Sequence, residues 1–331
     1  MAHAPAQLPY PAARLLVLHF GQMGDAVLAL PAVRALQQAY PSSERVLLTS
    51  SGGAQIFRLA GGWEVLAVDR RRWKTHPAQA ARELPGLWRR LRRRRFELSV
   101  DLHSYKETNL LAWSLRIPRR VAMLRPTRSW PRLINLPPPP DDPAGSLLAR
   151  YCRVLEPLGI AVTNRIPRLP PAPELSAAEQ AWRRQYLPGP CLGVFPGAGH
   201  PSRRWPIEHF HAVLAQFLAR HPDWSAVVFT GPEENDPALD RLRQLPRVRL
   251  RPGLPLAELA AAFAQCALVL SNDSGPAHLA AAAGARVLVL GAIPSFDPVG
   301  SVRVVRSPGP LRDLPIAPVL SALYASLDET S

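Results

Sequence analysis

The stretch that decides the fold is Arg14-Leu-Leu-Val-Leu-His-Phe-Gly-Gln-Met-Gly-Asp25. Its first seven residues are an apolar run of strand length, and Gly21 and Gly24 allow a tight turn after it. An apolar-periodic segment, Ala26 to Tyr40, comes next and predicts a helix. The stretch therefore predicts a strand, a glycine turn and a helix, with Asp25 near the helix start. Asp25 would thus lie at the carboxyl end of the first strand, which is the edge at which open α/β sheets bind ligands.

The same alternation of strand and helix continues outward from this stretch. Apolar runs predict further strands at 45–49, 65–68, 96–102, 191–195, 226–230, 267–270 and 287–290. Helical periodicity predicts helices at 52–60, 77–95, 207–220, 255–265, 273–284 and 316–327. Strands that alternate with helices imply βαβ units, so the fold class is α/β with parallel sheets.

Regularity falls between about residues 118 and 175, and the Pro-rich segment 167–173 has the composition of an interdomain linker. We expect an N-terminal domain over residues 1–170 and a C-terminal domain over residues 175–331 that ends in a helix at about 316–327. A chain of 331 residues that is 47% hydrophobic is long enough for two such domains.

The cysteines and the N-terminus indicate a cytoplasmic protein. Cys152, Cys191 and Cys266 lie far apart and form no CxxC pair, so we expect buried free thiols rather than disulfides or a zinc site. The first residues have no basic segment followed by an apolar core, so they do not predict a signal peptide. No apolar stretch approaches the roughly 20 residues that cross a bilayer.

The net charge of +15 lies entirely in the first half of the chain. Residues 1–170 hold 26 Lys and Arg against 11 Asp and Glu, whereas residues 171–331 hold 14 of each. A one-sided basic field attracts nucleic acid, anionic lipid or a phosphorylated substrate. The runs Arg70–Lys74 and Arg89–Arg95 carry much of this charge, with Trp73 and Trp88 interleaved. They fit a solvated helix face, a lipid contact or an RNA contact, and RNA ranks last because no nucleic-acid motif accompanies them.

Three segments have the residue types of a reactive site. Asp25 suits a helix cap and a catalytic base equally well. Gly197, Ala198 and Gly199, followed by Arg203, form a flexible loop that suits an anion, although a solvated loop is the simpler interpretation. The third segment, Asn272-Asp-Ser-Gly-Pro-Ala-His278, opens a helix whose N-terminus favours a diphosphate; its plainer interpretation is a helix cap with a buried histidine.

Together these segments resemble glycosyltransferase family 9, the bacterial lipopolysaccharide heptosyltransferases. The motifs that carry the resemblance occur in the family's order at residues 15–31, 196–199, 204–206, 230–233 and 272–279. The resemblance implies a GT-B fold, in which two Rossmann-like domains face a central cleft. It also implies an inverting, metal-independent transfer, typically from ADP-L-glycero-β-D-manno-heptose, with the acceptor on the N-terminal domain and the nucleotide sugar on the C-terminal domain.

The resemblance assigns roles residue by residue. Asp25 matches the general base, and Gly21 and Gly24 belong to its acceptor-side loop. The matches to the donor site are Gly197, Ala198, Gly199, Arg203, Glu233, Asp273, Ser274, Gly275 and His278. We expect no metal and no cofactor, a nucleotide-sugar donor and an anionic glycolipid acceptor. From the charge counts we expect Arg92, Arg93, Arg94 and Arg95 to form a basic patch for that acceptor or for the inner face of the cytoplasmic membrane.

Three features depart from the family pattern. Arg203 stands where a lysine is usual, Ala198 and Gly199 stand where some members have hydroxyl residues, and the region after Pro294 is short and lacks the cysteines of many members. These departures keep the reaction class and leave the donor sugar open. The alternatives are a different nucleotide-sugar donor, a sugar-nucleotide epimerase of related fold, and a non-enzymatic nucleotide- or RNA-binding protein.

Overall fold

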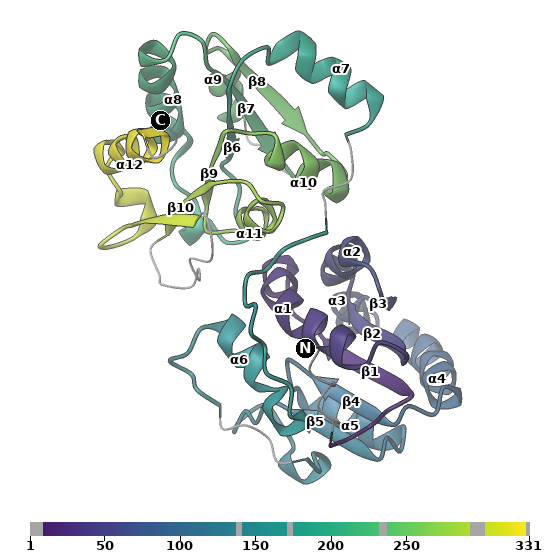
Figure 1. Ribbon diagram of the computed structural model, residues 1–331. Coiled ribbons are helices and arrows are strands. Elements are labelled where there is room, and N and C mark those ends of the chain that lie inside the picture. The colour runs from purple at the N-terminus through teal and green to yellow at the C-terminus, as the bar shows by residue number, and fades with distance from the viewer. Residues whose placement is uncertain (1–8, 137–140, 171–174, 232–236, 292–301, 329–331) are drawn as a thin grey trace, which may run out of the picture. The chain divides into compact units, whose positions relative to one another are not determined.

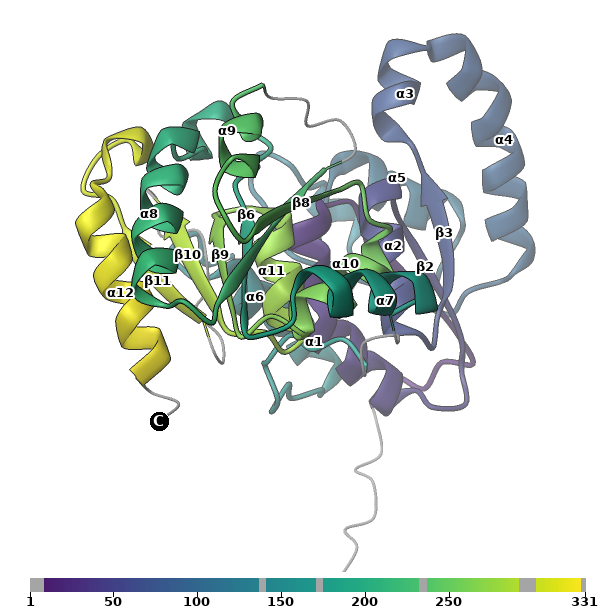
Figure 2. The same ribbon diagram turned by 90° about the horizontal axis from the view of Figure 1, so that it is seen from above.

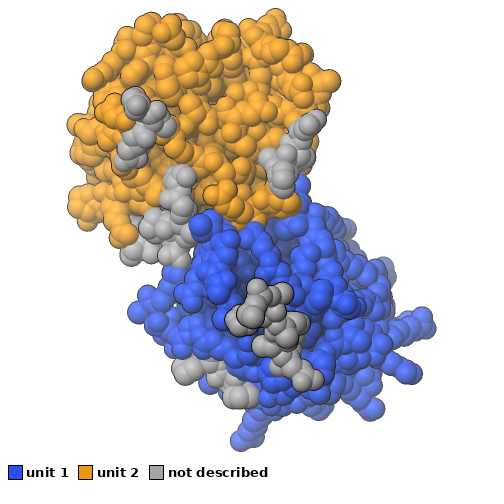
Figure 3. All heavy atoms as spheres, viewed as in Figure 1, with its two compact units in different colours: residues 1–167 blue, residues 168–331 orange. Residues whose placement is uncertain are grey.

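The apolar runs of the sequence form two separate parallel sheets in a computed structural model of the chain (Figure 1). The structure describes residues 9–136, 141–170, 175–231, 237–291 and 302–328. The chain divides into two compact units, which Figure 3 distinguishes by colour: unit 1 is residues 1–167 and unit 2 is residues 168–331.

Unit 1 has five parallel strands in the order β3-β2-β1-β4-β5. The strands are β1 Arg14–His19, β2 Glu44–Ser50, β3 Glu64–Val68, β4 Leu98–Asp101 and β5 Arg119–Ala122. The helices are α1 Met23–Ala39, α2 Ser51–Ala60, α3 Arg70–Thr75, α4 Pro77–Arg93, α5 Lys106–Ser114 and α6 Leu147–Arg153, with short 3-10 turns η1 Pro131–Leu133 and η2 Glu156–Leu158.

Unit 2 has six parallel strands in the order β11-β10-β9-β6-β7-β8. The strands are β6 Cys191–Phe195, β7 Ser225–Thr230, β8 Val248–Pro252, β9 Leu268–Asn272, β10 Val287–Gly291 and β11 Val302–Arg306. The helices are α7 Ala177–Tyr186, α8 Ile207–Arg220, α9 Leu239–Arg243, α10 Leu256–Ala264, α11 Gly275–Ala282 and α12 Ile316–Asp328, with 3-10 turns η3 Pro201–Arg203 and η4 Leu311–Asp313.

Each sheet has a point at which the strand order reverses. In unit 1 the chain moves outward from β1 through β2 to β3, then returns to β4 on the other side of β1. In unit 2 the same reversal separates β6 from β9. The loops that leave the carboxyl ends of two such neighbouring strands diverge to opposite faces, and the crevice between them is where open α/β sheets bind ligands. The strand order thus marks one candidate position in each unit.

Both α4 and α5 cover the same face of the sheet in unit 1. Leu91 of α4 and Ala112 of α5 belong to one buried cluster with Leu16 and Leu48 of the central strands. The Trp88 indole N–H also donates to Ser114 Oγ at 3.1 Å, which joins the two helices near their C-terminal ends. On the outer side α4 packs beside the short helix α3 (Figure 2).

Most predicted elements are present, and several unpredicted ones join them. The helix expected at 77–95 ends at Arg93, and Arg70–Lys74, interpreted only as a basic run, lies in α3. The structure also forms β5, whose sequence Arg-Arg-Val-Ala has only two apolar residues. It is stabilised because the Arg120 guanidinium donates to the carbonyls of Ile117 and Leu133.

The three cysteines, Cys152, Cys191 and Cys266, are buried free thiols, as predicted. Within the described part of the chain, the helices are too short or too polar for any of them to span a bilayer.

Candidate functional site

The glycine turn after β1 holds Asp25 in the first turn of α1. The Gln22 backbone N–H donates to Asp25 Oδ2 at 2.8 Å, so the carboxylate does cap the helix start. The carboxylate is still one-third exposed, which leaves it open to a ligand. Gly21 is required here because a Cβ on it would lie 2.4 Å from Asp25 Cβ and 2.6 Å from His103 Cε1. Gly24 lies in the same turn of α1 and is partly exposed.

His103 lies beside Asp25, although the sequence analysis assigned it no role. It follows β4, the strand next to β1 across the switch point, and its Nε2 is 3.9 Å from Asp25 Oδ2. The Tyr151 hydroxyl from α6 lies 3.3 Å from both ring nitrogens of His103. His19, the last residue of β1, packs edge-on against His103 with ring centroids 4.6 Å apart. A carboxylate, two imidazoles and a phenol therefore meet at this edge.

The turn that carries His103 is built around Asp101, the last residue of β4. The buried Asp101 carboxylate accepts hydrogen bonds from the backbone N–H of His103 at 3.2 Å and of Ser104 at 2.7 Å. The Thr108 hydroxyl and the Asn109 amide donate to its other oxygen. Ser104 adopts a φ of 49°, a backbone conformation uncommon outside glycine, and the Asp101 bonds hold it. The position of His103 is thus fixed by side chains rather than by regular structure.

Burial decides the protonation of these groups. It lowers the pKa of His19 to about 3 and the pKa of His103 well below its usual range, so both imidazoles are neutral near pH 7. The neighbouring His19 and the positive charges of Arg125, Arg70 and Arg128 also disfavour a proton on His103 and lower its pKa further. Burial also raises the pKa of Asp101 to about 6, although its hydrogen bonds oppose the shift.

Arg70 brings part of the basic run to the same edge. Its guanidinium lies 5.1 Å from the ring centroid of Phe20 and 4.8 Å from that of Tyr105, and it pairs with Glu107 at 3.2 Å. Arg125, after β5, has a buried Nε with no hydrogen-bond partner among the described residues. Cations therefore accompany the carboxylate at the carboxyl edge of this sheet.

The four arginines of the predicted basic patch, Arg92–Arg95, differ in their contacts. Arg92 donates to the Leu115 carbonyl, and Arg94 pairs with both Glu44 and Glu64. These two guanidinium groups tie α4 to the rest of unit 1. Arg93 and Arg95 are exposed, whereas Arg92 and Arg94 are partly buried, so two of the four guanidinium groups have structural partners and two remain available to a ligand.

In unit 2 the two predicted donor loops meet at the other switch point. The loop after β6 holds Gly197, Ala198 and Gly199, and the loop after the adjacent β9 holds Asp273, Ser274 and Gly275. The Asn272 side chain joins them, because its amide donates to the Pro196 carbonyl and its oxygen accepts the Trp205 backbone N–H at 3.3 Å. Asn272 is buried, and the sequence analysis gave it no separate role.

The rest of the first loop is held by its own side chains. The Arg204 Nε donates to the Ala198 carbonyl at 2.9 Å, and the buried Trp205 indole donates to the Leu314 carbonyl at 2.8 Å. Arg203, the last residue of η3, remains exposed. A Cβ placed on Gly199 would meet no atom within 4 Å, so the loop borders open space. The arrangement leaves one arginine and flexible backbone available at the sheet edge.

The second loop supplies the start of α11. Gly275 is the first residue of the helix, and Asp273 and Ser274 are buried just before it. His278 lies one turn further along, where burial lowers its pKa to about 4; the charge of Arg203 adds to this effect and that of Asp273 opposes it. A neutral imidazole, a helix N-terminus and an arginine therefore lie on adjacent strand ends, which suits a phosphate group.

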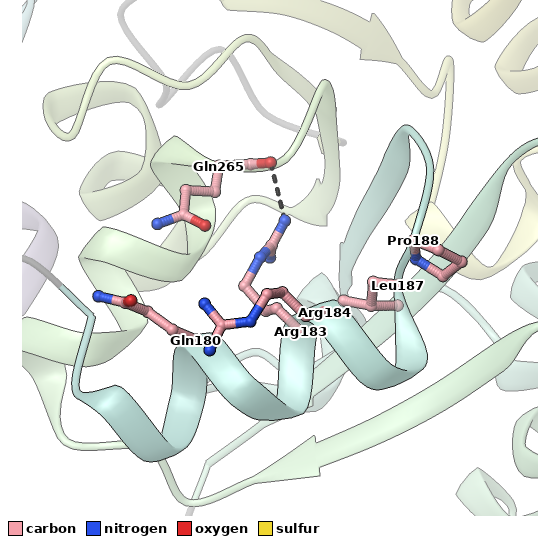
Figure 4. A pocket seen from close by; sticks show the side chains of 6 residues that line it. All are labelled: Gln180, Arg183, Arg184, Leu187, Pro188 and Gln265. Carbon is pink, nitrogen blue, oxygen red and sulfur yellow. Dashed lines mark hydrogen bonds between the residues drawn. The ribbon is translucent and has the colours of Figure 1, made fainter.

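Glu233, the residue predicted to contact the donor nucleoside, lies outside the described residues. A depression of about 490 Å³ on unit 2 is separate from the predicted donor residues (Figure 4); its lining residues are Gln180, Arg183, Arg184, Leu187, Pro188 and Gln265. In the described ranges, no group of three or more His, Cys, Asp or Glu side chains is placed to hold a metal ion.

Comparison with known proteins decides the family. The sequence model of glycosyltransferase family 9 (heptosyltransferase) matches residues 85–292, which is more than half of the chain. The chain belongs to this family. The predicted recognition is therefore confirmed.

The relatives agree with this assignment. Lipooligosaccharide heptosyltransferase 2 of Haemophilus influenzae is 35% identical over 109 residues, which cover 30% of this chain and only 31% of that relative. Among solved structures, the family 9 glycosyl transferase of Veillonella parvula superposes with a TM-score of 0.77 at 20% identity, covering 96% of this chain and 97% of that one.

The heptosyltransferase WaaC of E. coli, solved with ADP-2-deoxy-2-fluoro heptose, superposes with a TM-score of 0.73 at 21% identity, covering 96% and 100% of the two chains. These likenesses confirm the predicted fold class, an α/β protein with two Rossmann-like units of the GT-B type.

Proposed function

We propose that this family 9 protein transfers a heptose from ADP-heptose to a lipopolysaccharide-core or related cell-surface glycan, with inversion at the anomeric carbon and without a metal ion. The observation that carries the proposal is the pairing of chemistries at the two switch points. One offers a partly exposed carboxylate, and the other offers a helix N-terminus with an arginine. A glycosyl transfer needs a base for the acceptor hydroxyl and a holder for the leaving diphosphate.

Asp25 is the proposed general base. It removes the proton from an acceptor hydroxyl as that oxygen forms a bond to the anomeric carbon, while the bond from this carbon to the diphosphate oxygen breaks. Attack on the face opposite the leaving group inverts the configuration. One-third of the Asp25 side chain is exposed, which allows an acceptor hydroxyl to approach it.

His103 and Tyr151 are proposed to position Asp25. The imidazole lies 3.9 Å from Oδ2 and is itself bordered by the Tyr151 hydroxyl at 3.3 Å. Because burial keeps His103 neutral, it adds no charge that would weaken the basicity of the carboxylate. A neutral ring at this distance limits the rotation of the carboxylate without adding a charge beside it.

The loops of unit 2 are the proposed donor site. The backbone of Gly197, Ala198 and Gly199 and the start of α11 at Asp273, Ser274 and Gly275 receive the diphosphate, and Glu233 contacts the nucleoside. Arg203 and His278 interact with the same phosphates. Support comes from the Asn272 side chain, which joins both loops, and from the positive end of the helix dipole at Gly275. Negative charge that develops on ADP is stabilised there by fixed dipoles and one cation.

The acceptor is proposed to be an anionic glycolipid bound by unit 1. Arg70, Arg125 and Arg128 act electrostatically on His103, so their charge reaches the neighbourhood of Asp25. Phosphates or carboxylates on the acceptor would be attracted to this edge, and the fifteen positive charges in excess over residues 1–170 act in the same direction.

Thermal shift with a panel of nucleotide sugars tests the proposal, followed by turnover with the best ligand. ADP and ADP-heptose should raise the melting temperature, and a heptose-deficient lipopolysaccharide acceptor should then release ADP. A panel in which UDP-sugars stabilise the protein and ADP-sugars do not would show that the donor assignment is wrong. ADP released without acceptor would instead favour hydrolysis or epimerase-like chemistry.

A further inference from the structure

One face of unit 1 exposes large apolar side chains together with arginines. Five of the seven large hydrophobic side chains exposed in the described residues belong to α4, α5 or the segment just before η1: Leu84, Trp88, Leu110, Trp113 and Trp130. Their exposed fractions run from 38% for Trp88 to 53% for Trp113. Single exposed apolar residues are common on proteins, but a cluster on adjoining elements marks an interaction site.

The apolar side chains lie in rows along the two helices. On α4, Leu84 and Trp88 are four residues apart and share one face, while Leu91 on the neighbouring row is buried. On α5, Leu110 and Trp113 are three residues apart and share the outward face, while Ala112 is buried. Each helix thus presents one leucine and one tryptophan beside its buried row.

The two rows form one surface because α4 and α5 are joined. The Trp88 indole N–H donates to Ser114 Oγ, directly after Trp113 in the chain, and Arg92 donates to the carbonyl of Leu115. Trp130 borders the same surface, since its backbone N–H donates to the Asn109 side chain beside Leu110. We call the set Leu84, Trp88, Leu110 and Trp113 the Leu–Trp surface.

Exposed cations lie on the outward sides of the same two helices. On α4, Arg82, Arg89 and Arg93 are spaced by seven and four residues and therefore share a row, which lies on the side of the helix away from the buried Leu91. On α5, Lys106 lies on the same outward face as Leu110, and Arg116 is exposed just after the helix.

The acidic side chains of these helices are already engaged. Glu83 accepts hydrogen bonds from the Trp73 indole and the Gln79 amide, and Glu107 pairs with Arg70. The exposed arginine and lysine side chains on and next to these helices outnumber the two glutamates, so the net charge of the surface is positive.

We propose that the Leu–Trp surface docks unit 1 on an anionic lipid bilayer. Tryptophan and leucine side chains enter the interfacial layer, and the exposed arginines of α4 contact lipid phosphates, which is the pattern of helices that lie in the plane of a membrane interface. The charge complementarity selects an anionic membrane rather than a second copy of this equally basic unit. The inference rests on the proposed function in one respect, because a lipid-linked acceptor is found at such a bilayer.

Flotation with vesicles of phosphatidylethanolamine and phosphatidylglycerol, against vesicles of phosphatidylcholine alone, tests the proposal with the full chain. The Trp88→Ala/Trp113→Ala variant should bind the anionic vesicles at least about tenfold more weakly than the wild type. The conservative Trp88→Phe/Trp113→Phe variant should retain most of the binding. The matched control is Ile166→Ala/Tyr186→Ala, which removes the two exposed apolar side chains that lie elsewhere and should bind as the wild type does.

A second pair of variants tests the charges. Arg89→Ser/Arg93→Ser should lose about fivefold per arginine on anionic vesicles and nothing on neutral ones. Arg243→Ser/Arg312→Ser removes two exposed arginines of unit 2 and should change neither. Wild-type binding by both surface variants overturns the proposal, as does a dimer that both variants disrupt in the absence of any vesicle binding.

The ADP thermal shift separates this proposal from the proposed function. If ADP and ADP-heptose leave the melting temperature unchanged while vesicle binding still follows the Leu–Trp surface, the proposed function fails and the docking surface stands. If ADP stabilises every variant and vesicle binding ignores the surface, the docking proposal fails alone.

Discussion

The switch points of the two units differ in chemistry although the strands that form them have the same order. Between β1 and β4, the first contains a carboxylate at 33% exposure with neutral histidines packed beside it. Between β6 and β9, the second contains a glycine loop that borders open space, an exposed arginine and the start of a helix. The first arrangement suits proton transfer and the second suits a phosphate. The strand order therefore determines where a site can form, and the residues of the loops determine which chemistry that site can perform.

Arg203 carries the largest expected effect among the variants outside Asp25 that test this division of roles. Arg203→Ala should lower kcat/KM by about 100-fold, because the developing charge on the leaving diphosphate loses its cation. Arg203→Lys keeps the charge and should recover most of the loss. Arg312→Ala, at an exposed arginine of η4, is the control. Steady-state kinetics with varied ADP-heptose measures the effect, and an unchanged kcat/KM in Arg203→Ala contradicts the assignment.

The two glycines Gly21 and Gly199 give the sharpest contrast in packing. Gly21→Ala forces a Cβ to within 2.4 Å of Asp25 Cβ and should cost about 2 kcal/mol of unfolding free energy and at least tenfold in activity. Gly199→Ala meets nothing within 4 Å and should change the unfolding free energy by less than about 0.5 kcal/mol. Urea unfolding of both variants measures this difference. Equal destabilisation would mean that the first turn is not the more closely packed of the two.

His103 should show a smaller effect that is confined to the first switch point. His103→Ala should lower kcat about tenfold and shift the acid limb of the pH–rate profile, because Asp25 loses its neighbour. His103→Gln should restore much of the rate, and Tyr151→Phe should cost about threefold. The Kd for ADP should stay at the wild-type value in all three. A loss of kcat without any change in the pH profile would point to a purely structural role.

The buried histidines predict how stability depends on pH. Burial lowers the pKa of His19 from 6.5 to about 3, so the unfolded chain binds a proton that the folded chain does not between these values. The stability that His19 contributes is therefore present above pH 6.5 and is lost as the pH falls toward 3. His19→Leu should remove roughly 3 kcal/mol of the loss between pH 7 and 4. Urea unfolding at several pH values measures this, and an unchanged pH slope in the variant would contradict it.

Asp101 acts in the opposite sense to His19. Its folded pKa of about 6 lies above the ordinary value of 3.8, so its contribution is present at low pH and is lost as the pH rises through 6. His103 and His278, whose pKa values burial also lowers, act in the same sense as His19, and comparison of the wild type with His19→Leu isolates the contribution of His19.

Sequence patterns predicted the fold where apolar runs and glycines are local signals. The stretch from Arg14 to Asp25 and the segment from Asn272 to His278 both form the strand, turn and helix that their residues predict. The prediction was incomplete for β5, where long arginine side chains rather than apolar ones complete the strand. The run Arg92–Arg95 did not predict the partners of Arg94, since its pairing with Glu44 and Glu64 is set by folding and not by the run itself.

The missed residues of the candidate site depend on contacts between distant parts of the chain. His103 reaches Asp25 only because β4 pairs with β1, and Tyr151 arrives from α6 almost fifty residues later. The sequence did contain a signal at Asp101-Leu-His103, polar side chains at the carboxyl end of a predicted strand. Asn272 stood in a segment already singled out in the sequence, but its bond to the Pro196 carbonyl, 76 residues away, could not be predicted because it depends on the pairing of β6 with β9.

A single-turnover experiment with the Asp25→Asn variant tests the central claim most directly. ADP-heptose and a heptose-deficient lipopolysaccharide acceptor are mixed with wild-type or variant protein in excess, and ADP release is followed. The wild type should release ADP, while the variant should bind ADP-heptose with the same Kd and release ADP at least about 1,000-fold more slowly. Asparagine keeps the shape of the side chain, but it does not take up the proton. Transfer by the variant at the wild-type rate would contradict the assignment of Asp25 as the base.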